Sequence, residues 1–160
     1  MSISVGATIP EGTFTVMGTN GPEAVSAREL FAGKTAIVFG VPGAFTPTCS
    51  RQHLPGYVAG AEAIKARGVD FIACLATNDV HVMHAWSDAT GAGGKVMMLA
   101  DGNGTYTKAL GMELDLSVAG MGMRTRRFSM IVRDGVVQAV NVEPERGVTV
   151  SGADATSCQL

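Results

Sequence analysis

The chain has 160 residues, the size of one domain, and residues 1–160 are expected to form a single domain. Its 12 basic and 14 acidic residues leave a net charge of −2, which argues against a nucleic-acid partner, because binding a phosphate backbone needs clustered positive charge. The content of 46% hydrophobic and 16% charged residues is typical of a globular protein and argues against a disordered one.

The apolar segments indicate neither membrane insertion nor export. The longest apolar stretch, Thr35 to Phe45, is interrupted by Gly40, Pro42 and Gly43 and is too short to span a bilayer. The first twelve residues contain neither a basic segment nor the apolar segment that follows it in a secretory signal. The sequence therefore predicts a cytoplasmic protein without a membrane partner.

Strands and helices are expected to alternate along the chain. Apolar, β-branched runs predict buried strands, and apolar residues at helical spacing that end at a glycine predict helices. The expected strands are Thr13–Val16, Thr35–Gly40, Val69–Ala76, Lys95–Ala100, Arg127–Arg133 and Val136–Val142. The expected helical segments are Glu23–Phe31 (helical or irregular), Leu54–Gly68, Val80–Ala89, Thr105–Leu110 and Ser151–Gln159. This pattern predicts a mixed sheet flanked by helices, an α/β fold.

Several local signals refine these elements. Asp134-Gly135 predicts a tight hairpin turn between the last two strands. Asn78 or Asp79 is expected to cap the helix that follows, and Ser151 to cap the last helix. Pro55 is expected to bend its helix, because proline removes one backbone donor.

The three cysteines, Cys49, Cys74 and Cys158, are an odd number and include no C-x-x-C pair. This arrangement predicts neither a disulfide framework nor a four-thiolate zinc site. In a reducing compartment each cysteine is then either an inert core residue or a reactive thiol.

The strongest chemical signal lies between Val38 and His53, where a buried strand ends and a helix begins. Functional groups of α/β proteins gather at the carboxyl ends of strands. Thr46 followed by Pro47 predicts a helix cap with proline at the first helical position. Cys49 then falls in the first turn, where free backbone N–H groups and the helix dipole favour a thiolate. The alternative is a buried structural cysteine, and the position at a helix start favours the reactive one.

The motif Pro42-x-x-x-Thr46-x-x-Cys49 resembles the active-site pattern of the peroxiredoxins, and PGAFTPTCSRQHLPGY resembles their type II, or peroxiredoxin-5-like, branch. The resemblance continues in the family's order through CLATND, MLAD, TKALG, RTRRFSMIVRDG and NVEP. It implies a thioredoxin-like fold with a central mixed β-sheet flanked by α-helices. It also implies a thiol-dependent peroxidase that reduces hydrogen peroxide and organic hydroperoxides in antioxidant defence and redox homeostasis.

The resemblance also implies a role for each motif residue. Cys49 is the peroxidatic cysteine, which peroxide oxidises to sulfenic acid. Arg127 matches the active-site arginine that stabilises charge developing on the peroxide oxygens, and Arg124 matches a second, supporting arginine. Pro42 shields the thiolate from water. The Thr46 hydroxyl would cap the Cys49 N–H as a helix cap, and by resemblance it hydrogen-bonds the sulfur and the peroxide.

His53 lies one helical turn after Cys49 and is expected at the rim of the pocket in a peripheral role, because a stabilised thiolate needs no base. Arg126 alternates with Arg127 along the strand and is expected to face away from the site. With Arg133 it is expected to form a solvated basic edge.

No cofactor and no metal are expected. His81 and His84 stand three residues apart on a predicted helix, which is one possible metal pair. No carboxylate or cysteine stands at matching spacing to complete a site.

Cys74 is a possible resolving cysteine, because its spacing from Cys49 resembles that of plant type II members. The alternative is an inert thiol in the apolar run FIACLA. Cys158 is not expected to resolve, since Val150 stands where animal two-cysteine members have their resolving cysteine. If Cys74 resolves, the first turn after Cys49 must unwind, because a disulfide needs close Cα atoms.

The partners implied by the resemblance are a hydroperoxide substrate and a thiol reductant, which could be thioredoxin, glutaredoxin or glutathione. The resemblance also implies a homodimer, with Phe45 and Asn78–Asp79 near its interface. A noncatalytic redox sensor would use Cys49 as well, but would not need Arg127 and Thr46 to stabilise a leaving alkoxide. A disulfide oxidoreductase is disfavoured because the chain lacks C-x-x-C.

Overall fold

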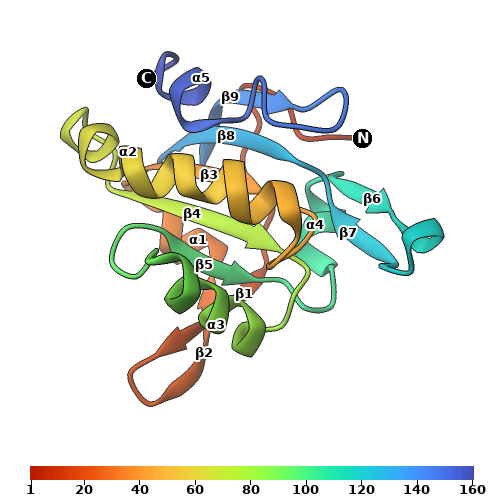
Figure 1. Cartoon of the computed structure of the whole chain (residues 1–160). Coiled ribbons are helices and arrows are strands. Elements are labelled where there is room, and N and C mark those ends of the chain that lie inside the picture. Colours follow the sequence, from red (N-terminus) through yellow and green to blue (C-terminus); the bar gives the residue numbers. More distant parts are fainter.

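The computed structural model describes all 160 residues, and a seven-stranded sheet in the order β2-β1-β5-β4-β3-β8-β9 runs through its middle (Figure 1). The strands of this sheet are β1 (Thr13–Gly18), β2 (Gly21–Ser26), β3 (Thr35–Gly40), β4 (Phe71–Ala76), β5 (Met97–Ala100), β8 (Phe128–Arg133) and β9 (Val136–Val142). The α-helices are α1 (Ala27–Phe31), α2 (Leu54–Ala66), α3 (Val80–Thr90), α4 (Thr105–Ala109) and α5 (Ala153–Ser157).

The central strands are parallel and the flanking ones antiparallel. β3 and β5 both pair in parallel with β4, and β8 pairs antiparallel with β3. Asp134 and Gly135 have positive φ angles of 47° and 75°, as the predicted tight turn between β8 and β9 requires. The sheet is therefore mixed and flanked by helices, as the expected thioredoxin-like fold requires.

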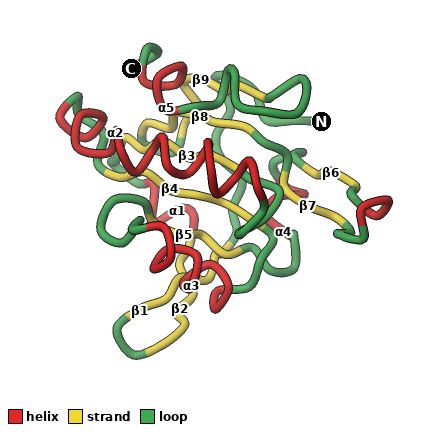
Figure 2. Tube along the Cα trace, in the orientation of Figure 1, coloured by secondary structure: helices red, strands yellow, loops and turns green.

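Helices lie over both faces of the sheet (Figure 2). Each face has its own hydrophobic core, because the central strands are buried on both sides. Side chains of α2, α3 and α5, among them Leu54, Trp86 and Ala153, pack on one face. Side chains of α1 and α4, among them Phe31 and Tyr106, pack on the other. At about 25 cal/mol per Å² of buried apolar area, these cores supply the main driving force for folding.

The structure corrects the prediction that Glu23–Phe31 is one helical or irregular segment. Gly21–Ser26 forms strand β2, which pairs with β1 in a hairpin, and only Ala27–Phe31 is helical. β2 lies at the edge of the sheet and is mostly exposed, so its sequence lacks the apolar pattern of a buried strand.

A second, two-stranded sheet was not predicted. It consists of β6 (Glu113–Asp115) and β7 (Met123–Thr125), which are joined through a short 3-10 helix at Ser117–Ala119. Strands of three residues are too short for their alternation to be recognised in the sequence.

Of the two predicted helix caps, the one for α3 is present and the one for α5 is not. Asp79 caps α3 by accepting from the N–H groups of His81 and Val82. The prediction that Ser151 caps the last helix is wrong, because α5 has Gly152 as its N-cap and no side-chain cap. The Ser151 hydroxyl donates to Glu143 instead.

The helix that contains Pro55 is irregular one turn before the proline. Helical conformation begins at Pro47, as predicted, and Cys49–His53 then form a π turn that leads into α2. The Leu54 N–H donates to the Cys49 carbonyl, five residues back rather than four. A proline ring collides with the carbonyl four residues before it, and the wider turn relieves that crowding.

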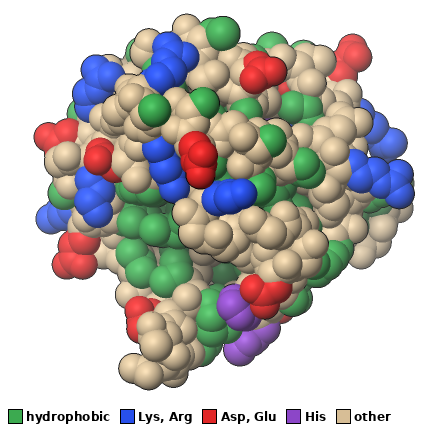
Figure 3. All heavy atoms as spheres, turned by 60° about the vertical axis from the view of Figure 1, so that its left-hand side comes forward, with side chains coloured by type: hydrophobic (Ala, Val, Ile, Leu, Met, Phe, Trp, Pro, Cys, Tyr) green, Lys and Arg blue, Asp and Glu red, His purple; other side chains and the backbone are tan.

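The surface carries charges of both signs. On the face drawn in Figure 3, Lys and Arg side chains lie interspersed with Asp and Glu, so this face forms no continuous basic surface. None of the helices combines the length and the apolar character that a membrane crossing requires.

Candidate active site

Cys49 lies at the start of the helix that follows β3, and its side chain is completely buried. The chain turns into this helix at Thr46, whose carbonyl accepts from the Ser50 N–H. Cys49 is the third helical residue and the first of the π turn. Its sulfur is therefore near the positive end of a helix and is shielded from bulk water.

Arg127, the residue just before strand β8, reaches the Cys49 sulfur. β8 runs antiparallel to β3, and the register pairs Gly40, the last residue of β3, with Phe128, the first residue of β8. Arg127 therefore lies beside the carboxyl end of β3, the end from which the chain continues to Cys49. Its Nη2 donates to Cys49 Sγ over 3.1 Å, whereas Arg126 next to it is exposed.

His53 is completely buried behind Arg127, so its expected place at the pocket rim is wrong. Its Nδ1 lies 3.0 Å from Arg127 Nη1, and its Nε2 lies 2.9 Å from the Ser151 carbonyl oxygen. Burial and then the nearby Arg127 charge lower the pKa of His53 to about 4, against the hydrogen bond to Ser151. At neutral pH the ring is uncharged, Nε2–H donates to Ser151, and Nδ1 accepts from Arg127.

Thr46 does not cap the Cys49 N–H. Its hydroxyl donates to the Gly43 carbonyl over 2.8 Å and closes the turn of the loop before the helix. This local bond from a threonine hydroxyl to a backbone carbonyl stabilises the four-residue turn Gly43–Thr46. The Thr46 oxygen keeps its lone pairs free as acceptors.

The loop that covers Cys49 is held from two sides. Arg124 donates from Nη1 to the Pro42 carbonyl over 3.3 Å and from Nε to the Met121 carbonyl over 2.8 Å. On the other side, Asn78 Oδ1 accepts from the Ala44 N–H over 2.8 Å. The bonds at Pro42 and Ala44 hold the loop through its backbone, and the bond to Met121 orients Arg124.

Positive charge at the site is not neutralised by carboxylates. The salt bridges of the chain are Arg28–Glu11 and His84–Asp88, and neither involves Arg124 or Arg127. Two guanidinium groups without acidic partners favour a negative charge in their surroundings. The arrangement therefore favours negative charge that develops on an oxygen beside the Cys49 sulfur.

The other two cysteines lie in different environments. Cys74 is buried on β4 opposite Phe39 of β3. Burial and then the neighbouring Cys49 raise the pKa of Cys74, so its thiol is protonated in this fold. Cys158 is exposed just after α5, and all three cysteines are free.

Two aromatic residues that help to hold the active-site helix in place were not singled out by the sequence. Trp86 of α3 donates from its indole nitrogen to Ser50 Oγ over 3.0 Å. Tyr57 of α2 stacks on Phe39 with a centroid distance of 4.1 Å and donates to the Ser151 carbonyl over 2.6 Å. A buried aromatic with a polar atom usually finds such a partner, but the sequence does not identify which one.

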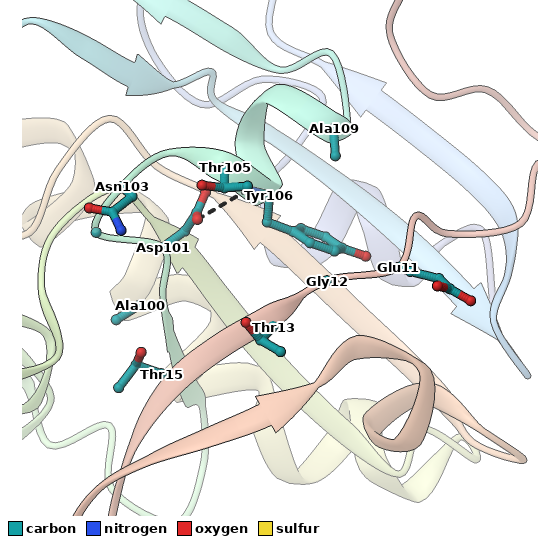
Figure 4. A pocket seen from close by; sticks show the side chains of 11 residues that line it. Glu11, Gly12, Thr13, Thr15, Ala100, Asp101, Asn103, Thr105, Tyr106 and Ala109 are labelled. Atoms are coloured by element: carbon teal, nitrogen blue, oxygen red, sulfur yellow. Dashed lines mark hydrogen bonds between the residues drawn. The ribbon is translucent and has the colours of Figure 1, made fainter.

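No group of three or more His, Cys, Asp or Glu side chains is arranged to hold a metal. A polar pocket of about 300 Å³ between β1, β5 and α4 contains none of the predicted site residues (Figure 4). Its buried Asp101 accepts from the N–H groups of Tyr106 and Thr107 and so caps α4.

A buried thiol beside an oriented guanidinium is suited to attack on a small electrophile that leaves as an anion. Cys49 has no second cysteine three residues away, where a disulfide oxidoreductase has one, which argues against that class. An O–O bond is an electrophile of this kind, because a thiolate displaces one oxygen and the other leaves as an alkoxide or hydroxide.

Comparisons with known proteins agree with this chemistry. Residues 4–156 match the Redoxin family. The chain is 48% identical over 153 residues to "Peroxiredoxin-2C" of Oryza sativa subsp. japonica, which covers 95% of this chain and 94% of that protein. The structure of reduced Prx3 from Vibrio vulnificus in complex with H₂O₂ superposes with a TM-score of 0.94, at 45% identity and 98% coverage of both chains. Peroxiredoxin 5 from Alvinella pompejana superposes with a TM-score of 0.82, at 34% identity, covering 98% of this chain and 94% of that one.

The match extends over nearly the full length of these relatives and includes the strand, loop and helix that bear Cys49. The resemblance read from the sequence is therefore confirmed. The chain belongs to the Redoxin family and is a type II peroxiredoxin, a thiol-dependent peroxidase.

Proposed function

We propose that Cys49 is the peroxidatic cysteine and that Arg127 is its catalytic partner. The observation behind this assignment is the 3.1 Å contact between Arg127 Nη2 and Cys49 Sγ. The thiolate attacks one oxygen of the hydroperoxide, the S–O bond forms and the O–O bond breaks. Cys49 becomes sulfenic acid, and the other oxygen leaves as water or an alcohol after it takes up a proton. Arg127 stabilises the negative charge that moves onto this oxygen.

The loop residues assist the same step. The Thr46 hydroxyl donates to Gly43, so its free lone pairs are available to accept the O–H of a peroxide and to align it with the sulfur. Pro42 covers the sulfur, and Arg124 supports Pro42 through its carbonyl. His53 supports Arg127 through Nδ1.

Cys74 is the proposed resolving cysteine, and Cys158 is not. Both Cys49 and Cys74 belong to the core on the α2 face, which places them on the same side of the sheet. A disulfide between them needs the π turn to unwind, and a π turn is a weak point of a helix. The electrons then come from thioredoxin, whereas glutaredoxin or glutathione reduces Cys49 directly.

The proposal extends to the oligomeric state of the protein and to its cellular compartment. The 160 residues act as one domain in a homodimer, with Phe45 and Asn78–Asp79 near the interface. Phe45 is 56% exposed on the active-site loop, a position that suits burial against a second copy. Three unpaired cysteines suit a reducing compartment such as the cytoplasm.

Peroxide consumption measured with single-cysteine variants tests these roles. Cys49→Ser removes the nucleophile, so turnover is abolished with every reductant while the circular dichroism spectrum stays unchanged. Cys158→Ser is the matched control and turns over like the wild type. Cys74→Ser keeps turnover with glutathione and loses it with thioredoxin. Wild-type turnover in Cys49→Ser would overturn the central role, and unchanged thioredoxin turnover in Cys74→Ser would assign Cys74 to the core.

A further inference from the structure

Glu143 directly follows β9, and its carboxylate accepts five hydrogen bonds. Four donors reach Oε1 at 2.7 to 2.8 Å: the N–H groups of Thr149, Val150 and Ser151 and the Ser151 hydroxyl. The Thr149 hydroxyl donates to Oε2 over 2.7 Å. One side chain thus fixes three consecutive residues, which we call the 149–151 turn.

The 149–151 turn presents one carbonyl to the active-site helix. The Ser151 carbonyl accepts from Tyr57 over 2.6 Å and from His53 Nε2 over 2.9 Å. Ser151, His53 and Tyr57 are all completely buried, so no water replaces these bonds. The bond to Ser151 holds the proton on Nε2 and thereby leaves the His53 Nδ1 lone pair facing Arg127.

The backbone of Glu143 also touches the site. Its N–H donates to the Arg127 carbonyl over 3.0 Å, next to the last pair of the β8–β9 ladder, Phe128 and Val142. Glu143 therefore holds the main chain of Arg127 directly and its guanidinium through the 149–151 turn and His53. The Glu143 carboxylate takes no direct part in the reaction at the Cys49 sulfur.

We propose that Glu143 is a positioning residue for peroxide reduction: its carboxylate fixes the 149–151 turn, which sets His53, which aims Arg127 at the Cys49 sulfur. The proposal rests on the roles proposed above for Cys49 and Arg127. A guanidinium tethered by His53 at Nη1 and by the sulfur at Nη2 has little freedom to rotate. Without the tether it samples other directions, and a shift of about 1 Å in a catalytic group costs up to about 10²-fold in rate.

The carboxylate stays ionised under the conditions in which the enzyme works. Partial burial raises the pKa of Glu143, but the hydrogen bonds from Thr149 and Ser151 outweigh it and lower the pKa to about 2. Hydrogen bonds to a charged acceptor are about twice as strong as those between neutral groups. The 149–151 turn is therefore held by charge-assisted bonds.

Glu143→Ala tests the proposal through the second-order rate of Cys49 oxidation by H₂O₂, followed by stopped flow. The rate is expected to fall by about 10- to 100-fold, less than in Arg127→Ala. Glu145→Ala is the matched control, since Glu145 is an exposed acid in the same segment without a side-chain hydrogen bond, and its rate stays at the wild-type value. Glu143→Gln keeps an acceptor oxygen but no charge, so its oxidation rate is expected between those of Glu143→Ala and the wild type. It replaces Glu143→Ala in the test if the alanine variant does not fold.

A double-mutant cycle separates positioning from a general loss of structure. In the Arg127→Ala background no guanidinium remains to be aimed, so Glu143→Ala or Glu143→Gln lowers the rate by less than about twofold. An unchanged rate in both single variants of Glu143, or an equal loss with and without Arg127, would overturn the proposal. Arg127→Ala alone tests the role of Arg127, so a failure there is seen separately from a failure at Glu143.

Discussion

The Cys49 sulfur receives its hydrogen bond from an arginine whose other partner is an uncharged histidine. A carboxylate in place of His53 would neutralise the guanidinium and weaken its effect on the sulfur. The buried imidazole instead orients Arg127 without cancelling its charge. At the residue scale, orientation and charge are thus supplied by different side chains.

Arg127→Ala should slow sulfur oxidation without unfolding the protein. Loss of one preorganised charge at a reacting oxygen typically costs about 10²–10³-fold, and the same loss is expected here in the rate with H₂O₂. Arg126→Ala is the matched control, because Arg126 is the adjacent residue and points to solvent. Equal rates in the two variants would show that Arg127 is not the catalytic arginine.

His53 should make folding stability depend on pH. Its pKa is about 4 when folded and 6.5 when unfolded, so the unfolded chain binds the proton first as the pH falls. This contribution to stability is complete above pH 6.5 and is lost as the pH falls toward 4, amounting to about 2 kcal/mol by pH 5. Urea unfolding at pH 7.5 and pH 5 measures it. The wild type should lose about 2 kcal/mol more than His53→Gln, and parallel losses would contradict a buried, neutral His53.

The motif residues are predictable from sequence because they are close together along the chain. Pro42, Thr46 and Cys49 lie within one loop and one helix start, and this local pattern can be recognised. The burial of His53 is not predictable in this way. Its partner Ser151 lies 98 residues further along the chain, and only the folded sheet brings the two together.

At the scale of elements, the active-site helix is packed into the core along α2, whereas the π turn at its start is less stable. α2 is anchored in the core through Leu54, Tyr57 and Ile64. The π turn before it has widened hydrogen bonding and is held to α3 by the bond between Trp86 and Ser50. Such a turn can open locally while the rest of the helix stays in place.

Trp86 is the single tryptophan, so its fluorescence should report this opening. If oxidation links Cys49 to Cys74, the π turn unwinds, the bond from Trp86 to Ser50 breaks, and the emission changes. Dithiothreitol should reverse the change. In Cys74→Ser oxidation stops at the sulfenic acid, and the emission should stay that of the reduced protein. The same change in both proteins would contradict unwinding driven by disulfide formation.

The elements missed by sequence analysis share one physical property. β2 lies at the sheet edge and β6 and β7 lie outside the main sheet, so little of their surface is buried. Strands such as β3 and β4 are buried on both faces, and their sequences are therefore nearly continuous apolar runs. The sequence therefore predicts the central strands and both hairpin partners β8 and β9, but not the peripheral strands.

At the scale of the molecule, the sheet gathers residues from distant segments at one edge. The π turn at the start of the helix after β3 supplies Cys49, the residue just before β8 is Arg127, and the segment after β9 supplies the 149–151 turn. The same region presents Phe45, whose φ of 62° lies in the left-handed region that residues other than glycine rarely adopt. A strained backbone that exposes an aromatic side chain fits the proposed contact of Phe45 with a second subunit.

Phe45→Glu should convert the proposed dimer into a monomer, because it places a charge in an apolar contact. Sedimentation velocity at micromolar concentration measures the change. Val118→Glu is the control, since Val118 is fully exposed on the 3-10 helix between β6 and β7 and should leave the dimer intact. A monomeric wild type, or a dimeric Phe45→Glu, would contradict the proposed interface.

The most direct test of the account asks which sulfur the peroxide oxidises first. The reduced protein is treated with one equivalent of H₂O₂ in the presence of dimedone, which traps sulfenic acid, and the adduct is located by mass spectrometry. The account predicts that the adduct lies on Cys49 and that Arg127→Ala forms it about 10²–10³-fold more slowly. An adduct mainly on Cys74 or Cys158, or equal trapping rates with and without Arg127, would contradict it.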